Sequence, residues 1–166
     1  MSESPRSSAA ADRVSHPGGR GRSGLQLVRE FPVARERVWL AWTRPDAIVQ
    51  WLGPPHWPAS QVTADVRVGG TWRACLSATD SDRRLWQSGR YLVVEPPERL
   101  EFTFQWEGAN HEDGPGVETH VTVVLVPTAD GGTRMQFSQV GLASAQSITG
   151  HIQGWEGTFG RLAQFL

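Results

Sequence analysis

The last twenty residues, SITGHIQGWEGTFGRLAQFL (residues 147–166), form the most regular pattern in the chain. The apolar side chains step by four, three, four, three and four positions; they are Ile148, Ile152, Trp155, Phe159, Leu162 and Leu166. This spacing predicts one apolar stripe along a helix of roughly five turns or more. Gly150, Gly154, Gly157 and Gly160 interrupt this helix, and each costs about 1 kcal/mol relative to Ala. Such a helix is stable only when its stripe packs against another surface.

Upstream of this helix, apolar and polar residues alternate, which predicts β-strands. The expected strands cover residues 25–31, 59–68, 71–78, 85–94, 100–106, 117–126 and 134–140. The turn signals between them are Gly69-Gly70, Asp80-Ser81-Asp82, Pro96-Pro97, the polar Gly-rich stretch 107–116 and Asp130-Gly131-Gly132. Strands separated in this regular way predict one antiparallel meander.

Two short helices are expected between the first strand and the second. Residues 34–42 carry apolar side chains at helical spacing. Pro45 suits the first turn of another helix, with Thr43 or Arg44 as its cap, and Gly53-Pro54-Pro55 ends it.

Together these elements predict an α+β fold, in which a curved antiparallel sheet of six to seven strands wraps round the long C-terminal helix. A curved sheet and a helix do not meet everywhere, so a cavity is expected between them. This domain is expected to span residues 25–166. Residues 1–24 are rich in Ser and Gly and hold very few apolar side chains, which predicts a disordered tail.

The composition argues against several kinds of partner. The net charge of the 166-residue chain is -1, and its arginines are scattered apart from Arg20 and Arg22 and the Arg83–Arg84 pair. No basic run occurs, so no nucleic-acid-binding surface is expected. No apolar stretch reaches the roughly 20 residues that cross a bilayer, so no membrane insertion is expected. The single Cys75 cannot form an intramolecular disulfide and fits a reducing compartment. Because the N-terminus lacks the apolar core of a secretory signal, a cytoplasmic location is expected.

The sequence resembles the SRPBCC, or START-like, superfamily, and within it the activator of heat-shock-protein ATPase homologue (AHSA-type) family. The resemblance covers residues 25–166 and rests on Arg29-Glu30-Phe31, Trp51-Leu52-Gly53-Pro54, Asp65-Val66-Arg67-Val68-Gly69-Gly70-Thr71-Trp72-Arg73, Glu95-Pro96-Pro97-Glu98-Arg99-Leu100, Gly131-Gly132-Thr133 and Gly154-Trp155. It implies the helix-grip fold, a cavity often used for hydrophobic ligands, and frequent homodimers. It implies no catalytic residue, because the family has no invariant catalytic set. Relatives often carry a second aromatic residue at the position of Leu52. This difference bears on the local wall of the cavity and not on the fold.

A small apolar or aromatic ligand held in this cavity is the leading hypothesis for function. The expected ligand-binding residues are Trp57, Trp72, Phe102, Phe104, Trp106, Thr119, Val121, Val123, Gln139, Trp155 and Phe159. The aromatic rings either line the pocket or pack as ordinary core. Thr119 and Gln139 either anchor the ligand or bond to water or the helix. Trp57 is expected at the rim, as a gate or as a surface anchor of its loop.

No catalytic, metal or cofactor site is expected. Glu118 and His120 share one face of a strand, but strand parity directs that face outward, which predicts a solvated pair. Cys75 has no base nearby in the sequence. His56 and His151 each stand alone, which is weak evidence for a site.

Three other roles stay open. An enzyme of the polyketide-cyclase or hydrolase type would use the same cavity, with Arg90, Tyr91, Glu101 or Gln139 assisting proton transfer. A co-chaperone-type protein interaction is suggested by the family name alone. The third is a homodimer. Gly150, Gly154 and Gly157 form a stripe on the helix, which either allows close approach of a second chain or is simply exposed.

Overall fold

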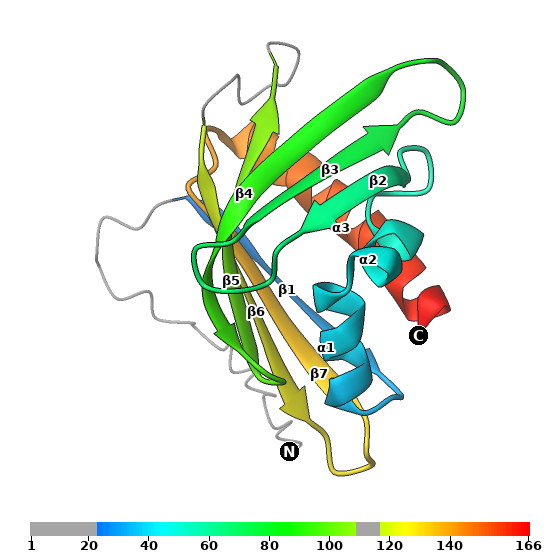
Figure 1. Cartoon of the computed structure of the whole chain (residues 1–166), viewed down its shortest axis with the longest axis vertical. Coiled ribbons are helices and arrows are strands. Elements are labelled where there is room, and N and C mark those ends of the chain that lie inside the picture. The colour runs from blue at the N-terminus through cyan, green and yellow to red at the C-terminus, as the bar shows by residue number, and fades with distance from the viewer. Residues whose placement is uncertain (1–22, 109–116) are drawn as a thin grey trace, which may run out of the picture.

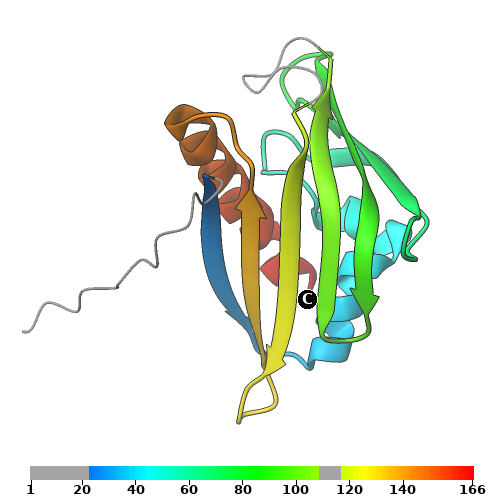
Figure 2. The same cartoon turned by 90° about the vertical axis from the view of Figure 1, so that its left-hand side faces the viewer.

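The computed structural model describes residues 23–108 and 117–166. Seven strands form one antiparallel sheet, and the helices lie together on its concave side (Figures 1 and 2). The strands are β1 (Gly24–Phe31), β2 (Ala59–Ala64), β3 (Thr71–Ser77), β4 (Arg84–Glu95), β5 (Arg99–Glu107), β6 (Thr119–Pro127) and β7 (Thr133–Val140). The helices are α1 (Arg35–Thr43), α2 (Pro45–Trp51) and α3 (Ala145–Phe165).

The strands are ordered β1-β7-β6-β5-β4-β3-β2, so β2 to β7 form a continuous meander. The first strand does not join the second. It pairs antiparallel with β7, in a register that sets Leu25 opposite Gln139 and Leu27 opposite Phe137. Helices α1 and α2 therefore carry the chain from one edge of the sheet to the other (Figure 1). The predicted helix-grip arrangement is confirmed.

The two short helices and the seven strands appear where the sequence predicted them, and Arg44 is the N-cap of α2. The strand expected over 59–68 is wrong in its second half, because β2 ends at Ala64. Residues 65–70 instead make a compact link, in which the Gly70 N–H donates to the Arg67 carbonyl. Val68 follows the alternating pattern yet is 64% exposed, since it lies in this link and not in the strand.

The disordered tail predicted over residues 1–24 lies outside the described residues except for its last two positions, and Gly24 already belongs to β1. Most of the loop predicted over 107–116 also lies outside them. No helix in the described ranges is long and apolar enough to span a membrane.

The apolar stripe of α3 packs on the concave face of the sheet, as its spacing predicted. Phe159 and Leu162 are fully buried, and the Phe137 ring of β7 lies 4.5 Å from the Trp155 ring and 5.1 Å from the Phe159 ring. Trp42 of α1 reaches the same cluster, with its ring centroid 6.3 Å from that of Phe137. Aromatic packing thus joins α1, α3 and β7 into one core.

Strands approach closely at Gly89. The Trp72 indole crosses this position to donate a hydrogen bond to the Thr103 carbonyl, at 3.1 Å. A Cβ on residue 89 would lie 1.8 Å from that carbonyl oxygen and 2.7 Å from the indole nitrogen. Only glycine leaves room for both groups, so we infer that Gly89 is required where β3, β4 and β5 meet.

Gly89→Ala is therefore expected to lower the free energy of unfolding by about 1–3 kcal/mol, because the strands and Trp72 must shift to admit the methyl group. Gly160→Ala is the matched control. It lies in α3 with open space at its Cβ position, so it should raise stability by up to about 1 kcal/mol. Urea unfolding of both variants tests this, and equal stability of the Gly89→Ala variant and the parent protein would contradict the packing argument.

Candidate functional site

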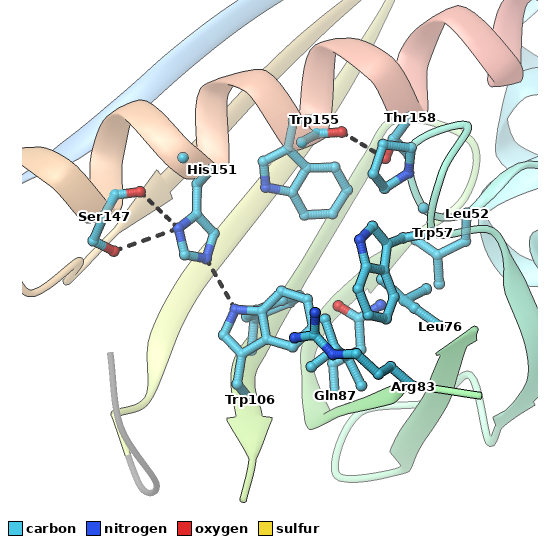
Figure 3. Close-up of a pocket in the computed structure, with 16 residues that line it drawn as sticks. Leu52, Trp57, Leu76, Arg83, Gln87, Trp106, Ser147, His151, Trp155 and Thr158 are labelled. Atoms are coloured by element: carbon cyan, nitrogen blue, oxygen red, sulfur yellow. Dashed lines mark hydrogen bonds between the residues drawn. The ribbon is translucent and has the colours of Figure 1, made fainter. Parts of the chain in front are cut away.

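A cavity of about 380 Å³ lies between the N-terminal half of α3 and the strands facing it (Figure 3). Its strand side is formed by Leu76 of β3, Leu85 and Gln87 of β4, and Phe104 and Trp106 of β5. The segment after α2 closes one end with Leu52, Gly53, Pro54 and Trp57. The helix contributes Ser147, Gly150, His151, Gly154, Trp155 and Thr158. The lining is largely apolar and aromatic, as is usual for sites that hold small molecules.

The glycines of α3 create much of the space on the helix side. Gly150 and Gly154 both line the cavity, and a Cβ at either position would meet no atom within 4 Å. Gly157, one turn further on, packs against Pro54, whose Cβ would lie 3.0 Å from an added Cβ. The glycine stripe therefore faces a cavity and a loop of its own chain. The sequence had suggested a different role for it, a contact with a second chain.

His151 links the helix to the strand wall across one end of the cavity. Its Nδ1 lies 2.8 Å from the Ser147 carbonyl, and its Nε2 accepts a hydrogen bond from the Trp106 indole at 3.2 Å (Figure 3). This pattern fits the neutral imidazole with its proton on Nδ1. The histidine thereby holds the Trp106 ring at the cavity wall, so both of its ring nitrogens are already engaged.

Arg161 ties the opposite end of the cavity to α3. Its Nη1 donates to the carbonyls of Leu52 and Gly53 at 2.8 and 3.0 Å, and its Nη2 donates to the Gln50 carbonyl at 3.0 Å. These carbonyls end α2, where a cation is favourable. Partial burial lowers the pKa of Arg161 from its ordinary value. The guanidinium keeps the segment that carries Trp57 against the helix.

Gln87 is the polar group at the floor of the cavity. It is 3% exposed, and its amide makes no hydrogen bond within the described part of the chain. It also lines a second cavity of about 40 Å³, which shares Leu52, Phe104 and Trp155 with the first. A cavity needs roughly 10–15 Å³ of such volume to hold one water molecule, so this inner cavity has room for one small group.

Two more polar groups border the inner cavity. The Trp42 indole N–H is buried and has no hydrogen-bond partner among the described residues. Tyr91 is 4% exposed and lines the same cavity, and burial raises the pKa of Tyr91 well above its ordinary value. Together with Gln87 they place neutral hydrogen-bonding groups around an otherwise apolar space.

The eleven residues expected from the sequence to bind a ligand fall into three sets. Those that line the main cavity are Trp57, Phe104, Trp106 and Trp155. Those that line only the inner cavity are Trp72 and Phe102. Those that belong to the packed core and line neither cavity are Thr119, Val121, Val123, Gln139 and Phe159.

The two polar candidates, Gln139 and Thr119, are satisfied within the protein. The Trp155 indole donates to Gln139 Oε1 at 2.8 Å, and Gln139 Nε2 donates to the Thr119 hydroxyl at 2.9 Å. That hydroxyl in turn donates to the Phe104 carbonyl at 3.0 Å. This chain of bonds orients Trp155 at the cavity wall and leaves neither side chain at a cavity surface.

Several lining residues were missed from the sequence, although it held signals for two of them. Gln87 shares the strand parity of Leu85 and Tyr91, so it belongs to the inward face. His151 lies one turn before Trp155 and one turn after Ser147, on the same face of the helix. Nothing in the sequence indicated Arg83, which precedes β4 and lines the cavity.

Glu118 and His120 do not pair with each other. His120 Nε2 lies 2.8 Å from Glu101 Oε2, and Glu118 lies 3.6 Å from Arg90. Burial alone would raise the pKa of Glu101, but hydrogen bonds from Arg99 and His120 outweigh it and lower the pKa. None of these five side chains lines either cavity, and no group of three possible metal ligands occurs in residues 23–108 and 117–166.

Solved structures with this architecture come from several bacteria. A protein from Chromobacterium violaceum is 25% identical with a TM-score of 0.73, over 87% of this chain and 97% of that chain. The AHSA1 protein from Silicibacter pomeroyi is 26% identical with a TM-score of 0.73, over 86% and 96%. A protein from Arthrobacter aurescens is 28% identical with a TM-score of 0.70, over 86% and 83%. A search of curated proteins finds no match.

Most of the sequence also matches one protein family. Residues 32–166 match the family described as "Activator of Hsp90 ATPase homolog 1-like protein". This range includes every element of the fold except β1, and with it both cavities. The chain therefore belongs to the family of Activator of Hsp90 ATPase homolog 1-like proteins, the AHSA-type branch of the SRPBCC superfamily that its sequence resembles.

Proposed function

We propose that this protein binds a small apolar or aromatic molecule in the main cavity between the sheet and α3. The observation that carries the proposal is the cavity of about 380 Å³, whose helix side is kept open by Gly150 and Gly154. Two alanines at these positions would favour the helix by about 1 kcal/mol each and would narrow the space. Glycine at these two positions thus lowers the stability of the helix and enlarges the cavity.

The lining supports a ligand that is flat and apolar. Trp57, Trp106 and Trp155 come from three different segments and surround the space together with Phe104. Rings of this size bury much area with little loss of conformational entropy, and they stack on aromatic ligands. The volume falls within the range of roughly 300–1,000 Å³ that is usual for small-molecule sites.

Gln87 supplies a polar anchor for such a ligand. The residue is 3% exposed and lines both cavities, and no hydrogen bond within the described residues engages its amide. Its position at the floor of the cavity supports a role in binding a neutral polar group on the ligand. Tyr91 and Trp42 line the inner cavity behind it and can serve the same group.

The enzyme hypothesis has less support from the same geometry. Of its four candidate residues, Arg90, Glu101 and Gln139 line neither cavity, and Tyr91 lines only the inner one. A proton-transfer group must come within about 3 Å of the reacting atom. The co-chaperone role, the homodimer and the cytoplasmic location stay predictions.

Filling the cavity from the helix should abolish binding without unfolding the protein. N-phenyl-1-naphthylamine, a neutral aromatic probe, is expected to bind the parent protein and to accept energy from the cavity tryptophans. Gly154→Leu should weaken this binding at least about tenfold, because the new side chain occupies the probe's space. Its melting temperature should hold or rise, since Leu favours a helix over Gly. Fluorescence titration and thermal unfolding measure the two effects.

Gly160→Leu is the matched control for this change, because it lies on the same helix, has open space at its Cβ position and does not line the cavity. It should bind the probe as the parent protein does. A parent protein that fails to bind the probe, or equal loss of binding in both variants, would refute the proposed site.

The two buried glutamines should respond in opposite ways to replacement by leucine. Gln139→Leu leaves the buried Trp155 indole N–H without its acceptor and removes the donor to the Thr119 hydroxyl. It should lower the free energy of unfolding by about 1–3 kcal/mol. Gln87→Leu removes no protein hydrogen bond and should leave the free energy of unfolding equal or slightly higher. It should also weaken the binding of 2-naphthol, measured by its competition with the probe. If Gln87→Leu destabilises the protein as much as Gln139→Leu, its amide serves the fold and not a ligand.

A further inference from the structure

We propose that the natural ligand is an apolar carboxylic acid, whose carboxylate lies at the cavity mouth and is bound by Arg83. This inference rests on the proposed function and adds the class and the orientation of the ligand. Arg83 is exposed while Gln87 is 3% exposed, so Arg83 marks the mouth of the cavity and Gln87 its floor.

The backbone of Arg83 is anchored in a turn, and its guanidinium contacts the Trp57 ring. Its backbone is fixed in the turn between β3 and β4, where its carbonyl accepts a hydrogen bond from the Ala78 N–H at 3.0 Å. Its guanidinium carbon lies 5.3 Å from the centroid of the Trp57 ring, within the range of a cation–π contact. Figure 3 shows both side chains beside the cavity, across from α3. The turn and the Trp57 ring therefore favour a position of the cation beside the cavity.

Arg83 differs from most other arginines in the described residues. The majority place the guanidinium against a carboxylate or a backbone carbonyl, as Arg73 does with Glu107 at 2.8 Å and Arg161 does with Leu52 at 2.8 Å. No carboxylate or carbonyl in these residues bonds to the Arg83 guanidinium, and it is the sole charged side chain among the lining residues. Its five N–H donors match a carboxylate in a bidentate geometry.

The charge of the ligand belongs at the mouth because the floor cannot hold it. The groups around the inner cavity are neutral: an indole N–H, a phenol and an amide. A buried carboxylate there would lack a cation and lose its hydration, which is strongly unfavourable. At the mouth the carboxylate keeps contact with water and gains the guanidinium. The apolar body then extends inward past Trp57 toward Gln87.

Competition against N-phenyl-1-naphthylamine tests this orientation with two ligands of the same shape. Naphthalene-2-carboxylate should displace the probe from the parent protein roughly three to ten times more effectively than neutral 2-naphthamide, the range expected for a charged contact at an exposed mouth. Arg83→Gln should remove this preference while leaving the affinity for 2-naphthamide within about twofold. The preference should also shrink at high salt, because the contact is open to solvent.

Arg84→Gln is the matched control. It makes the same change of charge at the next residue, which does not line the cavity and has no bonded partner for its guanidinium among the described residues. It should leave the preference for the carboxylate intact. The Kd of the probe itself is measured for every variant, so that each competition is corrected for it.

The outcomes separate this inference from the proposal on which it rests. A probe that binds, with equal competition by the two ligands or with no effect of Arg83→Gln, overturns the carboxylate assignment and leaves the binding site standing. Equal effects of Arg83→Gln and Arg84→Gln show general attraction by charge and also overturn it. A probe that does not bind the parent protein refutes the site, and the carboxylate assignment with it.

Discussion

The packing of α3 against the concave face of the sheet is the contact on which the whole structure depends. The helix contains four glycines, so it has little stability of its own and relies on burial of its apolar side. Burial is complete at Phe159 and Leu162, and rings of β7 and α1 meet the helix at Phe159. Toward its N-terminus the helix keeps a distance from β3 and β4, and the main cavity occupies that end.

Directional hydrogen bonds hold the helix where packing does not. Trp155 is bonded to Gln139 of β7, His151 to Trp106 of β5, and Arg161 to the carbonyls that end α2. Such bonds fix the positions of side chains while leaving the space between them unfilled, which apolar contacts alone cannot do. The Trp106 and Trp155 rings that line the cavity are therefore held by hydrogen bonds within the protein, and a ligand would meet a preformed wall.

The electrostatic character of the cavity follows from the same arrangement. Its interior offers neutral donors and acceptors at Gln87, Tyr91 and Trp42, and its one charged group, Arg83, lies at the exposed end. A molecule with an apolar body fits the interior, and a single negative charge fits the mouth. The convex side of the sheet keeps its own charges in pairs, such as Glu101 with Arg99 and His120.

Periodicity was sufficient to predict the order of the elements, the packing of the sheet round the last helix, and the inward faces of the strands. Burial of one face requires apolar residues at every second position of a strand and at every third or fourth position of a helix. Periodicity also placed Phe104, Trp106 and Trp155 on inward faces, whereas Trp57 was expected at the rim, as a gate or a surface anchor, from its Pro-rich segment. Periodicity could not separate cavity from core, since Gln139 and Gln87 both lie on inward faces and differ only in whether Trp155 supplies a partner. Arg83 carries no periodic signal, because it lies in a turn. Its place at the mouth, like the use of Gly150 and Gly154 as a cavity wall, arises from contacts between residues far apart in the chain, and local sequence does not encode the distances between them.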